Sequence, residues 1–234
     1  MAFPLTEWTE ISRATLHGEA GGHAALASLY ERYREPVLSF IRASGIAPDA
    51  VEDEAQSFFL HLMESRALHR AERTRGKFRT FLLTVLRHFL VDRVRHDMAA
   101  KRGGGHAPTW LDAAALDLPD PAANDAMRAP EFDREWAISV MQHALDQVAA
   151  EITSVHGAET WEVLKYFFTT TAARPAGRTA AAALDIDEGA LKKRVHHWRR
   201  RLGECVRAEI RRTVSAPHEV EEEVNYLRHL LTGG

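Results

Sequence analysis

Apolar residues recur at intervals of three and four along nearly the whole chain, and no run alternates apolar and polar residues for long enough to make a strand. This pattern predicts an all-α protein. The first apolar stripe, from Leu26 to Ile41, predicts a helix over about residues 23–44 that stops at Gly45. Pro36 lies inside this stripe, and we expect a kink or break there.

Two further helices follow in the first half of the chain. Pro48 and Asp49 suit a helix start, and the stripe behind them predicts a helix that runs to about residue 66. A third helix is expected over residues 76–101, before three consecutive glycines at 103–105. Its aromatic residues follow the apolar stripe, which predicts that they are buried in the core: Phe78, Phe81 and Phe89.

A change of composition marks a domain boundary. Residues 106–130 are rich in Pro, Ala and Asp and too irregular for a long helix, which is typical of a connecting arm. We therefore predict two helical domains, 1–105 and 131–234, joined by the linker 106–130. The second domain opens with an apolar stripe that starts at Phe132, followed by a short helix around residues 161–168.

The last third of the chain has the pattern of a helix-turn-helix motif. Residues 179–184 predict a short Ala-rich helix, 185–187 a turn with capping residues, and 188–201 a second helix. One apolar face of the second helix is expected to be buried: Leu191, Val195, Trp198 and Leu202. The remaining residues form the surface that a recognition helix would present to the major groove: Glu188, Gly189, Lys192, Lys193, His196, Arg199 and Arg200.

A solvated basic helix is the alternative interpretation of any one run of charge. Here the short first helix, the tight turn and the division of the second helix into apolar and basic faces coincide, and together they favour DNA binding.

The charge is unevenly distributed, although the formal net charge is only -3. Residues 66–106 hold 11 Lys and Arg against 3 Asp and Glu, and residues 174–212 hold 11 against 5. Residues 1–65 and 107–162 are acidic, with 4 basic against 10 acidic and 2 against 11. Two basic islands predict two separate contacts with an anionic partner.

Other features narrow the class of protein. The chain has no apolar run of membrane-spanning length and no signal-peptide pattern at its start, so we expect a cytoplasmic protein without a membrane contact. The single Cys205 has no second thiol for a disulfide or a zinc site and is expected to be structural.

A family resemblance rests on three segments. Residues 75–92 read RGKFRTFLLTVLRHFLVD, and with 101–105 they resemble the promoter-melting segment of extracytoplasmic-function (ECF, group IV) sigma factors of the sigma-70 superfamily. The FDREWA element at 132–137 and the pattern over 207–223 resemble a planctomycete-like subgroup of that family.

The resemblance implies a fold and a function. The first domain would correspond to sigma region 2, a domain of three or four helices that binds core RNA polymerase and opens the -10 element. The second would correspond to region 4, which reads the -35 element. Such a protein is not an enzyme and has no catalytic residues, metal or cofactor. Its implied partners are promoter DNA and the polymerase, through the beta-prime subunit and the beta flap. An anti-sigma factor is a further partner that the resemblance leaves open.

The resemblance also assigns site residues. The polymerase-binding face maps to Glu52, Asp53 and Gln56, whereas Glu54 stands where the family more often has an apolar residue. The loop over residues 68–75 would form the pocket for an unpaired base. Contacts with -10 DNA are expected from Arg75, Lys77, Arg79, Arg87, His88, Arg93, Arg95 and His96. Residues 179–183 depart from the usual first helix of region 4.

Three alternatives remain open. A helix-turn-helix regulator would bind DNA without polymerase, and a decayed sigma factor would bind polymerase without starting transcription. An enzyme of the metal-dependent phosphohydrolase class would use the pair His96 and Asp97, but no other matching ligand motif is present. The final acidic helix, over residues 217–231, is expected to pack on the second domain or to shield its basic face.

Overall fold

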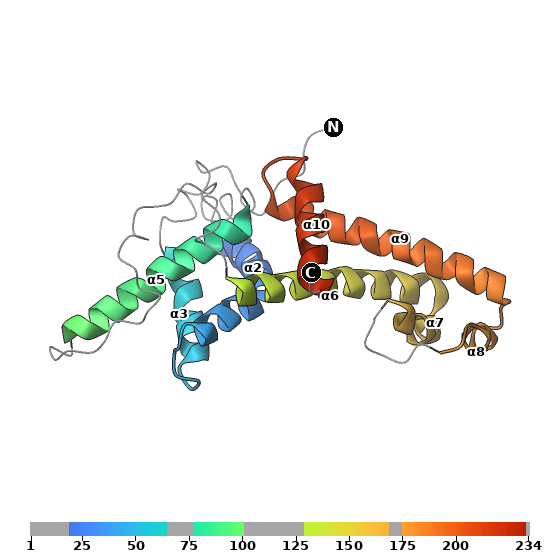
Figure 1. Ribbon diagram of the computed structural model, residues 1–234, viewed down its shortest axis with the longest axis horizontal. Helices are drawn as coiled ribbons and strands as arrows, with labels where there is room; N and C mark the ends of the chain where they lie inside the picture. The colour runs from blue at the N-terminus through green and yellow to red at the C-terminus, as the bar shows by residue number, and fades with distance from the viewer. Residues whose placement is uncertain (1–18, 65–76, 101–128, 169–174, 233–234) are drawn as a thin grey trace. The chain divides into compact units, whose positions relative to one another are not determined.

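The computed structural model describes residues 19–64, 77–100, 129–168 and 175–232, and within them not the side chains of 19–26, 63–64 and 96–100. All regular structure in these ranges is helical, which confirms the predicted all-α fold (Figure 1). The elements in chain order are α2 (Glu19–Ala43), α3 (Val51–Glu64), α5 (Phe78–Ala100), α6 (Pro130–His156), α7 (Ala158–Leu164), the 3-10 helix η2 (Lys165–Phe167), α8 (Gly177–Ala183), α9 (Glu188–Thr213) and α10 (Glu219–Thr232).

The chain divides into two compact units. Unit 1 comprises residues 1–139 and 210–234, and unit 2 comprises residues 140–209. This division differs from the predicted boundaries, because the start of α6 and the whole of α10 belong to unit 1. Most of the predicted linker lies outside the described residues, and its last residue, Pro130, is instead the first residue of α6, where proline is favoured because no amide hydrogen is needed.

Aromatic residues from α2, α3 and α5 form the core of unit 1. Tyr33 and Phe78 are fully buried with ring centroids 5.3 Å apart, and Phe58 meets Phe89 at 5.7 Å. Phe78 and Phe89 are buried as predicted, whereas Phe81 remains partly exposed. This core fixes the two helices that carry the predicted polymerase and -10 residues.

Pro36 is buried in α2, and the helix continues through it, so the expected break is absent. A proline has no amide hydrogen to donate to the carbonyl four residues earlier, which here belongs to Arg32. The hydroxyl of Ser139, in α6, donates a hydrogen bond of 2.9 Å to that carbonyl. A side chain 107 positions further along the chain thereby supports the helix at its proline.

Unit 2 contains the predicted helix-turn-helix elements. The turn between α8 and α9 has Asp185 in the left-handed region, with φ of 50°. The carboxylate of Asp187 accepts a hydrogen bond of 2.8 Å from the amide of Ala190 and so caps α9. A Cβ at Gly189 would lie 2.9 Å from the same carboxylate, so glycine gives the cap its space. The helix runs to Thr213, well beyond the predicted end at residue 201.

Candidate nucleic-acid interface

The start of α9 separates an apolar face from a basic face. Leu191, Val195 and Trp198 are 2%, 8% and 5% exposed and pack into unit 2, while Leu202 is partly exposed. The seven residues predicted for the recognition face are all exposed: Glu188, Gly189, Lys192, Lys193, His196, Arg199 and Arg200. The side chains of this face are thus accessible on unit 2, as a contact with DNA requires.

Two arginines of that face also have partners within unit 2. Arg199 donates from its Nε and from a terminal nitrogen to the carbonyl of Phe167, at 3.3 and 2.9 Å. This bond joins α9 to the end of η2. Arg200 lies 3.7 Å from Glu204, one turn further along the helix. The two lysines are therefore the clearer test of DNA binding, because replacing Arg199 would also alter a structural contact.

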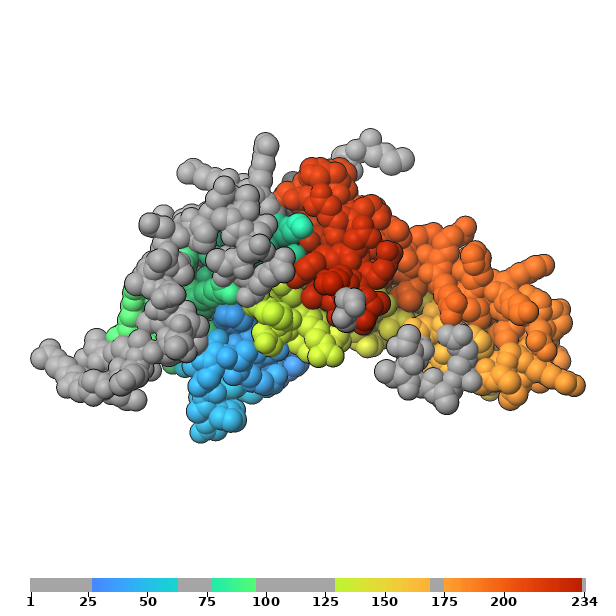
Figure 2. Space-filling view, viewed as in Figure 1, coloured from blue at the N-terminus to red at the C-terminus, as the bar shows by residue number. Residues whose placement is uncertain are grey.

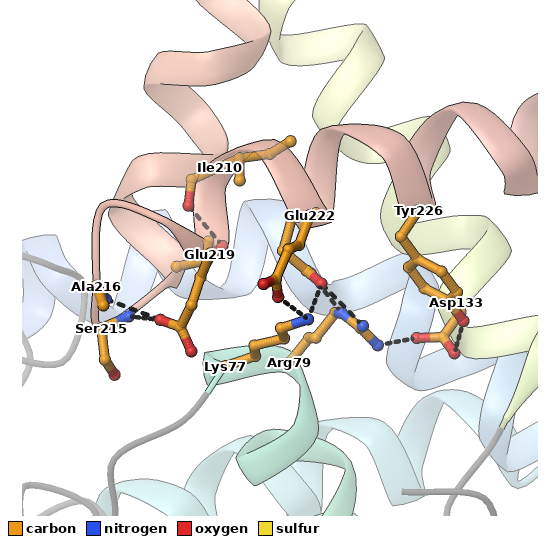
Figure 3. A network of polar contacts seen from close by, with 11 residues as sticks. Lys77, Arg79, Asp133, Ile210, Ser215, Ala216, Glu219, Glu222 and Tyr226 are labelled. Carbon is orange, nitrogen blue, oxygen red and sulfur yellow. Dashed lines mark hydrogen bonds and ion pairs between the residues drawn. The ribbon is translucent and has the colours of Figure 1, made fainter. Parts of the chain in front are cut away.

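A buried charged network lies at the start of α5 (Figure 3). The ammonium of Lys77 lies 2.6 Å from the carboxylate of Glu223 in α10. Arg79 donates to the same carboxylate at 2.8 and 3.2 Å and, through another nitrogen, to Asp133 of α6 at 2.6 Å. The hydroxyl of Tyr226 donates to the other oxygen of Asp133 at 2.8 Å. All five residues belong to unit 1.

Burial strengthens this network. The side chains of Glu223, Asp133 and Arg79 are 1%, 5% and 14% exposed. The guanidinium of Arg79 also lies over the rings of Trp136 and Tyr226, 5.2 and 4.6 Å from their centroids, where a cation is attracted to the aromatic face.

The ionisation of the network follows from its pairing. Burial by itself would lower the pKa of Arg79, but the hydrogen bonds and charges of Glu223, followed by the charge of Asp133, raise it above the ordinary arginine value. Burial by itself would raise the pKa of Glu223, yet the hydrogen bonds and charges of Arg79 and Lys77 lower it overall. Both groups therefore carry full charge at neutral pH.

The other predicted -10 residues have different surroundings along α5. Arg87 is partly buried over the ring of Phe40, 5.6 Å from its centroid, and burial lowers its pKa. Arg93 is exposed and forms an ion pair of 2.6 Å with Glu54 of α3. This pair gives Glu54 a role in joining α3 to α5, at the position where the family more often has an apolar residue.

The structure says less about the other residues that are predicted to contact -10 DNA. His88 is partly exposed, and Arg95 is exposed 3.9 Å from Asp92. Arg75, with the whole loop 68–75, and the side chain of His96 lie outside the described residues.

The predicted polymerase-binding residues lie on one helix, α3. Glu52, Asp53 and Gln56 are all exposed, and Glu52 accepts a hydrogen bond of 2.7 Å from Arg34 of α2. Leu60 is 56% exposed and follows Asp53 and Gln56 at helical spacing on the same face. This exposed leucine was not predicted.

Glu223 and Asp133 were also missed, although the sequence holds a signal for Glu223. It lies within the buried stripe of α10 formed by Val220, Val224 and Leu227, where a carboxylate needs a buried cationic partner. The final helix was expected to pack on the second domain or to shield its basic face; the structure shows that Glu223 pairs with two cations of the first island, Lys77 and Arg79.

Other classes of site find little support in the part of the chain that the structure describes. Its His, Cys, Asp and Glu side chains form no group of three or more that could hold a metal ion. The side chains of His96 and Asp97 lie outside the described residues, so the enzyme hypothesis is not tested there. Among the described helices, none has the length and apolar character needed to span a membrane.

Residues 29–99 match the family model of sigma-70 region 2. The matched segment covers most of α2, all of α3 and nearly all of α5. The match supports the interpretation that the chain is a member of the sigma-70 family. No curated protein and no solved structure matches the chain.

Proposed function

We propose that this chain is a sigma factor that binds core RNA polymerase and directs transcription from specific promoters. The observation that carries the proposal is the sigma-70 region 2 match, because its helices are those that form the core of unit 1. Region 2 supports a role in polymerase binding and promoter melting. The proposed role is one of binding and needs no catalytic residue or cofactor.

Polymerase would bind at the exposed face of α3. Asp53, Gln56 and Leu60 supply a charge, an amide and an apolar side chain on one face, with Glu52 beside them. We propose the beta-prime subunit as the partner for this face and the beta flap as a partner for unit 2. We propose the cytoplasm as the location of a protein with this role.

Promoter DNA would be read at two places. The basic face of α9 is proposed to enter the major groove of the -35 element, because its cations are exposed while its apolar face is buried. The start of α5 and the loop before it are proposed to bind the opened -10 element. Opening requires that unpaired bases bind better than paired ones.

The finer classification also remains a proposal. The segments at 75–105, 132–137 and 207–223 support an ECF group IV sigma factor of the planctomycete-like subgroup. An anti-sigma factor would be a natural partner of such a protein. The rival function is a helix-turn-helix regulator that binds DNA through α9 without polymerase.

Binding to purified core polymerase separates the two functions. We expect the wild-type chain to form a complex and the D53A/Q56A variant to bind at least about tenfold more weakly, since the few residues that dominate an interface each cost more than about 1 kcal/mol when truncated, and this proposal assigns both residues to that group. A matched control is Q142A/D146A, which removes one amide and one carboxylate from an exposed pair on α6. No complex with the wild-type chain would favour the regulator, and equal weakening by both double variants would refute the assigned face.

The DNA face has its own test. We expect K192A/K193A to weaken promoter binding by the polymerase complex while assembly with core enzyme is unchanged. Each lost phosphate contact should reduce the slope of log affinity against log salt by about 0.9. The control R211A/R228A removes the same charge from exposed positions on α9 and α10. An unchanged slope in K192A/K193A would refute this face.

A further inference from the structure

The carboxylate of Glu223 is bound by two cations, an arginine and a lysine, that are also suited to a phosphate group. It receives two hydrogen bonds from Arg79 and an ion pair from Lys77, and its side chain is 1% exposed. Arginine binds carboxylate and phosphate oxygens in the same two-nitrogen geometry, and lysine binds phosphate as a point charge. Glu222, on the exposed side of α10, adds a second carboxylate 4.0 Å from Lys77.

From this arrangement we infer that Lys77 and Arg79 form a nucleic-acid phosphate site that the chain's own α10 occupies through Glu223. The inference rests on the proposed function, because the competing ligand is the backbone of opened promoter DNA. In the described structure α10 covers the site, and Figure 2 shows the C-terminal segment in red against the start of α5. DNA would bind there only when α10 is displaced.

The energetics allow such an exchange. Burying an ion pair removes both charges from water, and that cost offsets much of their attraction, so a buried pair gives little net stability. A polyanion that offers several phosphates to the same cations can therefore compete with one carboxylate. When a phosphate replaces Glu223, both cations keep an anionic partner. Displacement of α10 without DNA would leave Arg79 paired with Asp133 but without Glu223.

The construction of α10 suits a helix that leaves as a unit. The carboxylate of Glu219 accepts hydrogen bonds from the amides of Ser215 and Ala216, at 2.8 and 2.7 Å, and so caps the helix start. Both donors lie in the segment just before α10. The cap therefore stays intact when contacts with α5 are lost.

The inference is tested with the full chain and a labelled single-stranded oligonucleotide, without polymerase. We expect E223Q to bind the oligonucleotide about tenfold more tightly than the wild-type chain, since it weakens a charge-assisted hydrogen bond that competes with binding. The control E221Q makes the same change of charge at an exposed position of α10 and should raise the affinity by less than about twofold. Adding K77A to E223Q should remove the gain.

Three outcomes would overturn the inference: equal gains in E223Q and E221Q, a gain that survives K77A, or no oligonucleotide binding by any variant. Hydrogen exchange of the wild-type chain gives a second test that needs no variant. Amides of residues 219–232 should exchange faster when the oligonucleotide is bound, and unchanged protection would overturn the inference. Core polymerase is absent from both tests, so failure of the proposed function would appear separately, as loss of complex formation.

Discussion

The bond between Ser139 and the proline-interrupted helix α2 gives a sharp prediction about how the fold is held together. The hydroxyl of Ser139 donates a hydrogen bond of 2.9 Å to the Arg32 carbonyl. In an uninterrupted helix, this carbonyl would accept from the amide of residue 36, which proline lacks. We expect S139A to destabilise unit 1. In a P36A background the same substitution should cost little, because the new amide at position 36 can donate to that carbonyl.

The magnitude follows from the environment of the bond. It is neutral and partly buried, so its loss should cost about 1 kcal/mol. The cost in the P36A background should be close to zero, which gives a coupling energy of about 1 kcal/mol between the two positions. P36A has effects of its own on packing, because Pro36 is buried, and the double-mutant comparison cancels them.

Hydrogen exchange measures this coupling energy in the full chain, because it reports the opening free energy of each helix separately. In S139A, amides of α2 around Arg32 should exchange about fivefold faster than in the wild-type chain, whereas S139A/P36A should match P36A alone. Amides of α9 in residues 188–201 serve as an internal control. An equal effect of S139A in both backgrounds would refute the idea that Ser139 replaces the proline's missing donor.

Three further predictions follow from other sites. The lowered pKa of Glu223 means that its ion pairs stabilise unit 1 above the ordinary glutamate pKa of about 4.3, and that this stabilisation is lost as pH falls through the lower folded value. The stabilities of wild-type and E223Q in urea unfolding should therefore differ at pH 7 and converge as the pH falls below the folded pKa of Glu223. Burial raises the pKa of the Cys205 thiol, so Ellman's reagent at pH 8 should react at least about tenfold more slowly with the native chain than with the urea-unfolded chain, and equal rates would contradict the burial. G189A should displace the Asp187 cap, and this loss of about 1 kcal/mol offsets the gain that Ala gives over Gly in a helix; D187A should therefore destabilise the wild-type chain by about 1 kcal/mol but add little to G189A in thermal unfolding.

Local sequence patterns predicted most of the helices. Apolar spacing of three and four is set within one helix, so the existence of α2, α3, α5 and α9 could be inferred from the chain alone. Helix ends were less certain: α9 continues for another twelve residues past residue 201 because nothing there breaks it, and the apolar face continues through Cys205 and Ile210.

Contacts between distant segments could not be predicted in the same way. The bond from Ser139 to Arg32 and the pairing of Arg79 with Glu223 join residues 107 and 144 positions apart. Arg79 was predicted as a DNA contact because the family resemblance places it in the promoter-melting segment, but the sequence does not reveal which carboxylates lie opposite it. The grouping of α10 with unit 1 depends on the same long-range pairing.

The surface residues were easier to assign than the buried ones. The exposed face of α9 was predicted because the opposite face of the helix is apolar, and each of the seven residues predicted for the exposed face is exposed. Leu60 was missed, although it lies at helical spacing from Asp53 and Gln56 and therefore falls on the polar face of α3.

Run-off transcription tests the central claim most directly. Purified core polymerase is combined with the full chain and a library of upstream regions, and the transcripts are sequenced. The proposed function predicts defined start sites that share upstream motifs at two separated positions and that disappear when the chain is omitted. Transcripts that do not depend on the chain, or DNA binding without any initiation, would contradict it.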